Sequence, residues 1–257
     1  MTQLSPACAQ HLRFVSRNGQ TYLRARMPSP EDKRLAPALR GRQIVQFLKP
    51  LPAVRRAAVE FSFCLPEHFD LKSGKDMFGG KMGFGLVAGS SIPDPANNSL
   101  RQDWVKPATL PSGGYPPSLP ERMSARLMFR YSARLQKTVL GLYAYTSSLY
   151  PGHPEILQYG LNLQVDETLR PGLLHRVWYE VDMTRNRYRL QLNSTRRDWQ
   201  LDELTPPHSW GKGFIDGLWF SHFYGGPNSG DWQPAATTCI DYGEVRVAGR
   251  LEELTGS

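Results

Sequence analysis

In the segment Ser124-Ala125-Arg126-Leu127-Met128-Phe129-Arg130-Tyr131, two kinds of side chain alternate along the chain. A β-strand points successive side chains to opposite faces of a sheet, so this alternation predicts a strand with one apolar face. The apolar face, made by the alanine, leucine, phenylalanine and tyrosine, belongs in a core. The other face carries a serine, a methionine and two arginines, which are costly to bury unless they face water or an anion.

Similar β-patterned segments recur along most of the chain, separated by turn residues such as Thr184-Arg185-Asn186, which suit a tight hairpin. Few stretches show helical periodicity. We therefore expect an all-β fold, a β-jelly roll sandwich of antiparallel sheets with a concave groove. The expected strands are residues 43–48, 56–63, 124–131, 138–146, 174–183, 188–192, 217–224 and 242–247.

The 257 residues show no internal repeat and no second-domain boundary, so residues 1–257 are expected to form one domain. Residues 90–121 interrupt the β pattern with seven prolines, which exclude a central strand. We expect a long loop insertion there. Its Trp104 and Tyr115 could stack on or clamp a ligand, although a purely decorative insertion is equally compatible with the sequence.

The formal net charge of +8 is carried mainly by arginine, since only eight of the 31 basic residues are lysine. Arginine forks suit carboxylate, sulfate or phosphate, which favours an acidic partner. The arginines are scattered, and no recognition helix, zinc spacing or aromatic RNA-binding motif is present, so nucleic acid is not the expected partner. The other acidic partner considered is an anionic polysaccharide, and the charge alone does not separate the two.

Neither a metal nor another cofactor is expected, because Cys8, Cys64 and Cys239 form no metal-binding spacing and no Asp/His cluster has one. No apolar run is long enough to span a membrane. Residues 1–10 lack the features of a signal peptide, so a secreted or periplasmic location is favoured only if a leader has been removed. Nothing in the sequence indicates an oligomeric state.

A glycine-rich stretch with a single lysine, Phe78-Gly79-Gly80-Lys81-Met82-Gly83-Phe84-Gly85-Leu86, follows the expected strand at 56–63. Glycines let the backbone turn and approach another group closely, and the lysine supplies a compact cation. Alone, this stretch is equally well explained as a strand end whose lysine points to water.

A tyrosine pair supplies the remaining signal. Within the expected strand 138–146, alternation puts Tyr143 and Tyr145 on one face and Leu142 and Ala144 on the other. A hairpin joining this strand to 124–131 would place the tyrosines beside Ser124 and Arg126.

Taken as an ordered set, Gly79-Gly80-Lys81, Ser124-x-Arg126 and Tyr143-x-Tyr145 resemble the pattern of polysaccharide lyase family 14, which contains alginate and glucuronate lyases. The glucuronan lyases of family 20 are similar in the Gly-Gly-Lys segment. The resemblance spans roughly residues 55 to 248 and implies a β-jelly roll. This sequence departs from the family after Lys81, where Met82-Gly83-Phe84-Gly85 replaces the usual Leu-Pro-Gly-Leu, and the segment before Ser124 is longer.

The resemblance implies a metal-independent lyase that cleaves an acidic, uronate-containing polysaccharide by β-elimination. It gives the catalytic role to Lys81, Ser124, Arg126, Tyr143 and Tyr145. Lys81 and Arg126 would neutralise the C6 carboxylate, with Ser124 as a hydrogen-bond donor. The tyrosines would be base and acid, and nearby cations would lower a tyrosine's pKa toward use. Which tyrosine is the base stays open, and Lys81 could itself be the base.

Further contacts with the polysaccharide are expected from Arg130, Trp104, Tyr115 and His222. His222 alternates with Phe220 and Tyr224, so it either lines the groove or is an ordinary buried strand histidine. The alternating Trp178, Glu180 and Asp182 could lie on a groove wall or on a solvated outer sheet. The alternative function is a non-catalytic jelly roll that binds anionic carbohydrate.

Overall fold

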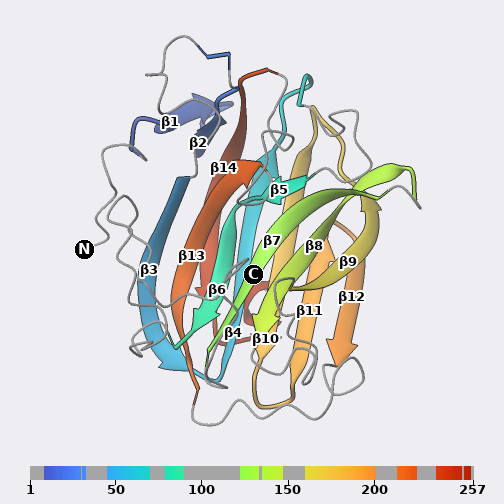
Figure 1. The fold of residues 1–257 in the computed structure, drawn as a ribbon. Helices are drawn as coiled ribbons and strands as arrows, with labels where there is room; N and C mark the ends of the chain where they lie inside the picture. Colours follow the sequence, from blue (N-terminus) through green and yellow to red (C-terminus); the bar gives the residue numbers. More distant parts are fainter. Residues whose placement is uncertain are drawn as a thin grey trace.

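Two antiparallel β-sheets form the protein (Figure 1). The computed structural model describes residues 9–29, 31–32, 45–69, 79–89, 122–132, 135–146, 160–200, 213–224, 236–250 and 252–255, and within them each sheet has seven strands. Sheet A contains, in spatial order, β1 (Leu12–Arg17), β2 (Gln20–Met27), β14 (Thr238–Ala248), β4 (Arg56–Cys64), β10 (Leu174–Asp182), β11 (Arg187–Leu192) and β12 (Thr195–Gln200).

Sheet B contains, in spatial order, β3 (Val45–Val54), β13 (Ile215–Tyr224), β5 (Gly79–Lys81), β7 (Met123–Ser132), β8 (Lys137–Thr146) and β9 (Leu161–Thr168). Strand β6 (Phe84–Ala88) follows β5 and also pairs with both β13 and β7. A short helix, α3 (Glu252–Thr255), follows β14. The expected β-jelly roll sandwich is confirmed.

The eight expected strands are all present, with small shifts at their ends. The largest shift is in the first, which the structure describes as β3 from Val45 and extends to Val54. The turn at Thr184–Asn186 joins β10 to β11 as expected, and Asn186 adopts a positive φ of 49° there. Strands β1, β2, β5, β6, β9 and β12 were not expected. The proline-rich segment 90–121, with Trp104 and Tyr115, lies outside the described residues.

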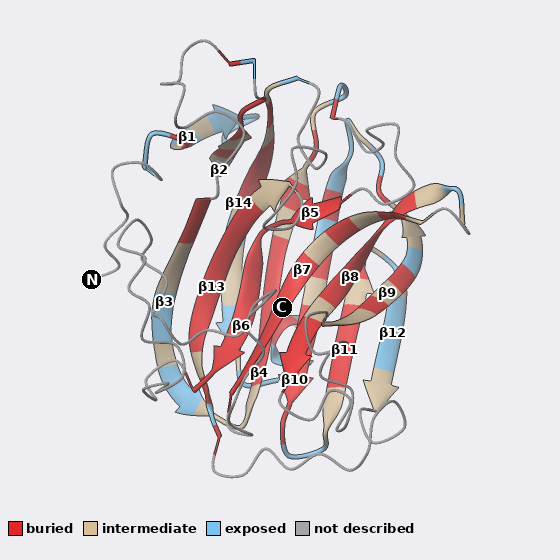
Figure 2. Ribbon diagram, in the orientation of Figure 1, coloured by how far each residue is buried: buried red, intermediate tan, exposed pale blue. Residues whose placement is uncertain are grey.

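Alternation along β7 sorts its side chains as its sequence predicts. Ala125, Leu127, Phe129 and Tyr131 belong to the apolar core between the sheets. Figure 2 shows that burial is greatest in the central strands of sheet B, including β6, β7 and β13. The other face of these strands is directed away from the core, and it is this face that carries the polar side chains.

His222 lies in the core and not on the polar face of sheet B, so its expected contact with a polysaccharide is wrong. Its ring is completely buried, stacks near Phe220 and places Nδ1 2.9 Å from the hydroxyl of Tyr242, which belongs to β14 of the opposite sheet. Burial lowers the pKa of His222 to about 3, which keeps the ring neutral.

The Tyr242 hydroxyl also fixes the connection between β5 and β6. It accepts a hydrogen bond from the backbone N–H of Gly83 at 3.1 Å, which leaves its own proton for Nδ1 of His222. Gly83 has a φ of +68°, and a Cβ there would lie 2.5 Å from the Phe61 ring. Only glycine fits this position, and the turn it makes sets the end of the strand that carries Lys81.

We predict that Tyr242→Phe lowers the free energy of unfolding by about 1–3 kcal/mol, because it leaves two buried polar groups without a partner. Chemical denaturation with an unchanged slope would measure this loss. Tyr188→Phe is a matched control, since within the described residues that buried hydroxyl has a single hydrogen bond, to the weakly accepting Sδ of Met123 at 3.3 Å. Equal losses for the two variants would contradict the assigned role of Tyr242.

Candidate functional site

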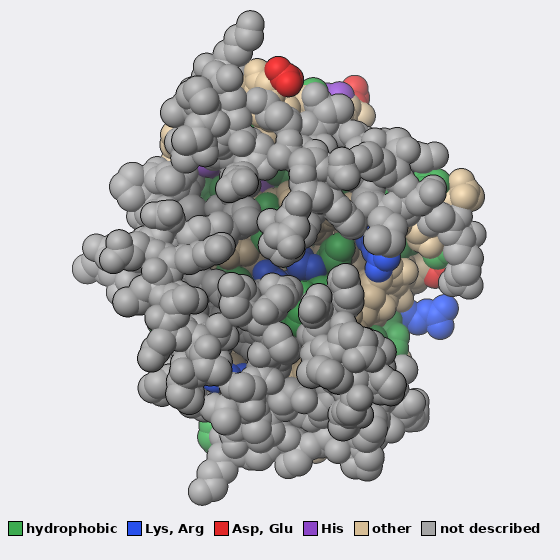
Figure 3. Space-filling view, viewed as in Figure 1, with side chains coloured by type: hydrophobic (Ala, Val, Ile, Leu, Met, Phe, Trp, Pro, Cys, Tyr) green, Lys and Arg blue, Asp and Glu red, His purple; other side chains and the backbone are tan. Residues whose placement is uncertain are grey.

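The candidate site is the face of sheet B directed away from the core, and we call it the site face. Its central residues come from β5, β7, β8 and β13: they are Lys81, Ser124, Arg126, Met128, Arg130, Tyr143, Tyr145, Trp219 and Ser221. Figure 3 shows Lys and Arg side chains near the middle of this side of the molecule, over β6 and β7.

The register of β7 against β8 brings the predicted residues together. Ser124 pairs with Tyr145, and Arg126 pairs with Tyr143. Lys81 on β5 pairs with Met128 on the other side of β7. The predicted hairpin of β7 and β8 is therefore confirmed. All five residues proposed as catalytic lie on the site face of three adjacent strands, β5, β7 and β8.

Lys81 is held against an aromatic ring and a sulfur atom, and in the described part of the chain no carboxylate forms an ion pair with it. Its Nζ lies 3.6 Å from the centroid of the Tyr143 ring and donates a hydrogen bond to Sδ of Met128 at 3.0 Å. The side chain is 6% exposed. Burial first, then the charges of Arg126 and Arg130, lower the pKa of Lys81 well below its ordinary value. The site therefore favours a neutral amine at Lys81.

Arg126 is a buried cation that stacks on an indole ring. Its guanidinium carbon lies 4.3 Å from the centroid of Trp219 and 5.9 Å from that of Tyr145. Gly85 on β6 makes room for it, since a Cβ there would lie 2.8 Å from Cγ of Arg126. Burial lowers the pKa of Arg126 to about 10, so the group stays charged at neutral pH. Its Nε has no hydrogen-bond partner in the described residues, which leaves a donor for an anion.

The tyrosine pair differs from the expectation in one respect. The Tyr143 and Tyr145 rings meet edge to face, with centroids 5.2 Å apart. Burial raises the pKa of Tyr145, and the charge of Tyr143 and a hydrogen bond with it act in the same direction. These effects outweigh the opposing effect of Arg126, so the expected lowering of a tyrosine pKa by nearby cations is wrong for Tyr145. Its hydroxyl is held in the protonated form.

Two residues of the site face, Trp219 and Ser221, were not predicted from the sequence. Ser221 is buried, and its Oγ has no hydrogen-bond partner within the described residues. Alternation in β13 did place these residues opposite His222, but a period of two does not say which set faces the core. The decisive signal is the core contact of Phe220 with Phe47 and Phe84, which a sequence does not show.

Within the described residues, no group of three or more His, Cys, Asp or Glu side chains is arranged to hold a metal ion. In the same part of the chain, no helix is both long and apolar enough to cross a membrane. Arg130 lies on the site face near Lys81 and contributes to the lowering of its pKa, which is compatible with its expected contact with a polysaccharide.

The fold is similar to solved structures of alginate lyases. A lysine and tyrosine to alanine double variant of alginate lyase Aly36B, in complex with an alginate tetrasaccharide, matches with a TM-score of 0.62 at 15% identity, covering 98% of this chain and 93% of that chain. A second variant, with a lysine and a methionine replaced, in complex with an alginate trisaccharide, matches with a TM-score of 0.61 at 14% identity, covering 97% and 94%. The structure of alginate lyase Aly36B itself matches with a TM-score of 0.59 at 16% identity, covering 96% of this chain and 92% of that chain.

No family model and no curated protein sequence matches the chain. At such low identity the structural similarity establishes the fold, and the resemblance to family 14 stays a prediction.

We predict a favourable coupling of about 0.5–2 kcal/mol between Trp219 and Arg126 in a double-mutant cycle of stability, because the indole face stabilises the buried guanidinium. The cycle would use Trp219→Leu, Arg126→Met and the combined variant. As a control, Trp219→Leu combined with Lys137→Met should be additive within about 0.5 kcal/mol. Additivity in both cycles would argue against the stacking.

Proposed function

We propose that this protein is a lyase that cleaves an acidic, uronate-containing polysaccharide by β-elimination. The observation that carries the proposal is the arrangement around Lys81, where a buried amine with a lowered pKa lies beside Tyr143 and shares a face with Arg126. The alginate lyase fold supports it. The residue types replaced in the two Aly36B variants, lysine, tyrosine and methionine, are also the three types that meet at Lys81.

In this proposal, Arg126 neutralises the C6 carboxylate of the uronate. Removal of the C5 proton puts negative charge on that carboxylate, and a fixed cation there stabilises the transition state. Arg126 is suited to this because the Trp219 ring holds it and no carboxylate of the described residues forms an ion pair with it. Ser124 assists as a hydrogen-bond donor. The positive charge comes from side chains, so the proposed reaction requires no metal.

Lys81 is proposed as the base. A base must be unprotonated, and the lowered pKa of Lys81 raises the fraction of neutral amine near neutral pH. Of the open alternatives, this assignment fits the electrostatics better than a tyrosine base at Tyr145, whose pKa is raised.

The tyrosine pair is proposed to supply the acid. Because the hydrogen bond with Tyr143 favours protonated Tyr145, Tyr145 is the donor in that bond and the Tyr143 proton is left for the glycosidic oxygen. The C5 proton moves to Lys81, the C4–oxygen bond breaks, and a C4–C5 double bond forms. The proton gained by Lys81 is released to solvent and Tyr143 takes a proton from solvent, which restores both groups for the next cycle.

We predict that Lys81→Met lowers the rate of unsaturated uronate formation at least about 100-fold, since general base catalysis typically contributes this much. Ultraviolet absorbance of the new double bond would measure the rate on a panel of polyuronates. Lys137→Met, which removes a lysine at the start of β8 paired with Asp166, is the control and should retain activity. Wild-type protein that produces no such absorbance on any polyuronate would refute the proposal.

The pH dependence follows from the same assignment. Above the lowered pKa of Lys81 the amine is neutral and activity is full, and activity falls as the pH falls through that pKa and protonates the amine. Because the pKa of Tyr145 is raised, any loss of activity in alkaline solution shifts to a higher pH. A rate that rises only near the ordinary lysine pKa of about 10.4 would contradict the burial effect.

The position of base and acid on one face also predicts a stereochemical preference. Lys81 and Tyr143 approach a sugar ring from the same side, which suits a C5 proton and a C4 oxygen that are cis, as in mannuronate and glucuronate. We expect faster cleavage of mannuronate-rich than of guluronate-rich alginate when initial rates are compared. The reverse order would show that base and acid act from opposite faces.

The alternative is a jelly roll that binds anionic carbohydrate without cleaving it. It would be established by saturable binding of a polyuronate with no new reducing ends after prolonged incubation. The neutral amine favoured at Lys81 argues against it, because a purely binding site gains more from a charged lysine.

A further inference from the structure

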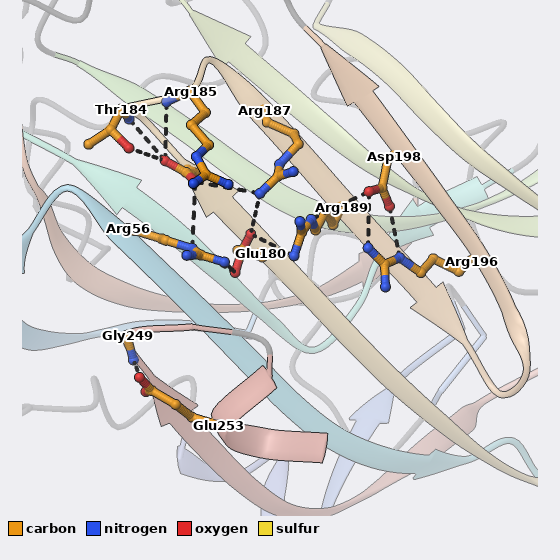
Figure 4. A network of polar contacts seen from close by, with 11 residues as sticks. Arg56, Glu180, Thr184, Arg185, Arg187, Arg189, Arg196, Asp198, Gly249 and Glu253 are labelled. Atoms are coloured by element: carbon orange, nitrogen blue, oxygen red, sulfur yellow. Dashed lines mark hydrogen bonds and ion pairs between the residues drawn. The ribbon is translucent and has the colours of Figure 1, made fainter. Parts of the chain in front are cut away.

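A second polar cluster lies on the face of sheet A that is directed away from the core (Figure 4). Two buried carboxylates form its centre, Glu180 and Asp182 of β10, which are 0% and 1% exposed. The alternation of Trp178, Glu180 and Asp182 therefore marks the outer face of sheet A and not a wall of the site face. Arginines from β4 and β11, on either side of β10, converge on these two carboxylates.

The arginines outnumber the carboxylates that they share. Nε of Arg56 donates to Glu180 at 2.9 Å and lies 3.5 Å from Asp182. Nη1 of Arg189 lies 3.5 Å from Glu180. Nη2 of Arg187 is 3.8 Å from Glu180 and 3.7 Å from Asp182, too far for hydrogen bonds. Nε of Arg189 also lies 3.4 Å from Asp198, which is paired with Arg196 as well. Among the described residues, four guanidinium groups thus share three carboxylates, and the cluster keeps an excess of positive charge.

The hydrogen-bonding capacity of Arg187 is not fully used. Its Nε and Nη2 are buried and have no hydrogen-bond partner within the described residues. Burial and the charge of Arg189 lower the pKa of Arg187, as expected where cations are crowded. An additional anion close to this cluster would relieve that crowding.

A pocket opens directly above the cluster. Its volume is about 430 Å³, and it is lined by Arg56, Arg185, Arg189, Arg250 and Glu253. This volume lies within the range of about 300–1,000 Å³ that is typical of ligand sites. Four guanidinium groups therefore line it against one carboxylate, and Glu253 already accepts the backbone N–H of Gly249 at 3.1 Å.

Two of the lining arginines are available to a ligand. Arg185 belongs to the β10–β11 turn and Arg250 follows β14, and both are exposed. In the part of the chain that the structure describes, neither guanidinium group is in an ion pair. Exposed arginine forks beside a partly neutralised cluster bind carboxylate groups well, because the guanidinium plane matches the two oxygens.

We propose that this pocket, the arginine pocket, is a second, non-catalytic binding site for the carboxylate groups of an acidic polysaccharide. The identity of the polymer rests on the proposed function. Nucleic acid fits less well, because single strands require exposed aromatic rings for base stacking. Trp178, which shares this face with Glu180 and Asp182, instead packs against Ala58 and Leu254.

The arginine pocket and the site face lie on opposite sides of the sandwich, because each is the outer face of its own sheet. A short oligosaccharide therefore occupies one site at a time. A long polymer, or a network of polymers, engages both sites, and the second contact benefits from a raised effective concentration. The pocket thus serves to retain the protein on polymeric substrate and does not affect cleavage of short chains.

The test compares the double variant Arg185→Gln/Arg250→Gln with the control Arg170→Gln/Arg197→Gln, which removes the same charge at exposed positions outside the pocket. Binding of polymannuronate and of a mannuronate trisaccharide would be measured by calorimetry in a Lys81→Met background that prevents cleavage. We expect the dissociation constant for polymer to rise about 5- to 30-fold in the pocket variant, as for the loss of two charge contacts. Trisaccharide binding should not change, and the control should bind polymer as the parent does.

An equal effect of both double variants would overturn the proposal, because it would show a dependence on net charge alone. Unchanged polymer binding in the pocket variant would overturn it as well. So would a competition experiment in which single-stranded DNA displaces the polymer from the pocket at a lower concentration than free polyuronate does. The proposed lyase activity is judged separately on wild-type protein. Absence of cleavage together with pocket-dependent polymer binding would refute that activity and retain the second site.

Discussion

The site depends on the pairing register between β7 and β8. With Arg126 opposite Tyr143 and Ser124 opposite Tyr145, these four side chains fall on one face. A slip of one residue would send the same side chains into the core and bring Leu127 and Leu142 to the surface. The apolar face of the hairpin thus fixes the chemistry of the opposite face, because burial of its leucines and phenylalanine selects a single register.

Two basic side chains are buried on the site face, and the surrounding groups offset only part of the cost of charging them there, so the pKa of each is lowered. Lys81 has an aromatic ring and a thioether where a lysine more often has a carboxylate, and Arg126 has an indole. Cation–π contacts of this kind contribute about 0.5–2 kcal/mol each, less than the cost of removing a charge from water. A bound carboxylate would complete the site, so the stability sacrificed here is recovered when an anion binds.

Arginine has different roles on the two sheets because its neighbours differ. On sheet B, Arg126 stacks on Trp219 and forms no ion pair with an acidic residue among those that the structure describes, so it is available for a reacting group. On sheet A, Arg56, Arg187 and Arg189 surround Glu180 and Asp182, where they form a fixed positive platform. The same net positive charge therefore supports a reactive cation on one side and a docking surface on the other.

Periodicity along the chain determined the all-β class, the principal strands and the two faces of β7 and β8, because a strand's side-chain alternation is a local property. Tertiary structure decided what depends on neighbours distant in sequence. In β13 both faces are buried, so alternation could not choose between His222 and the pair Trp219 and Ser221, and contact with the opposite sheet made the choice. The pKa directions of Lys81 and Tyr145 likewise follow from desolvation, which only the assembled sheets produce.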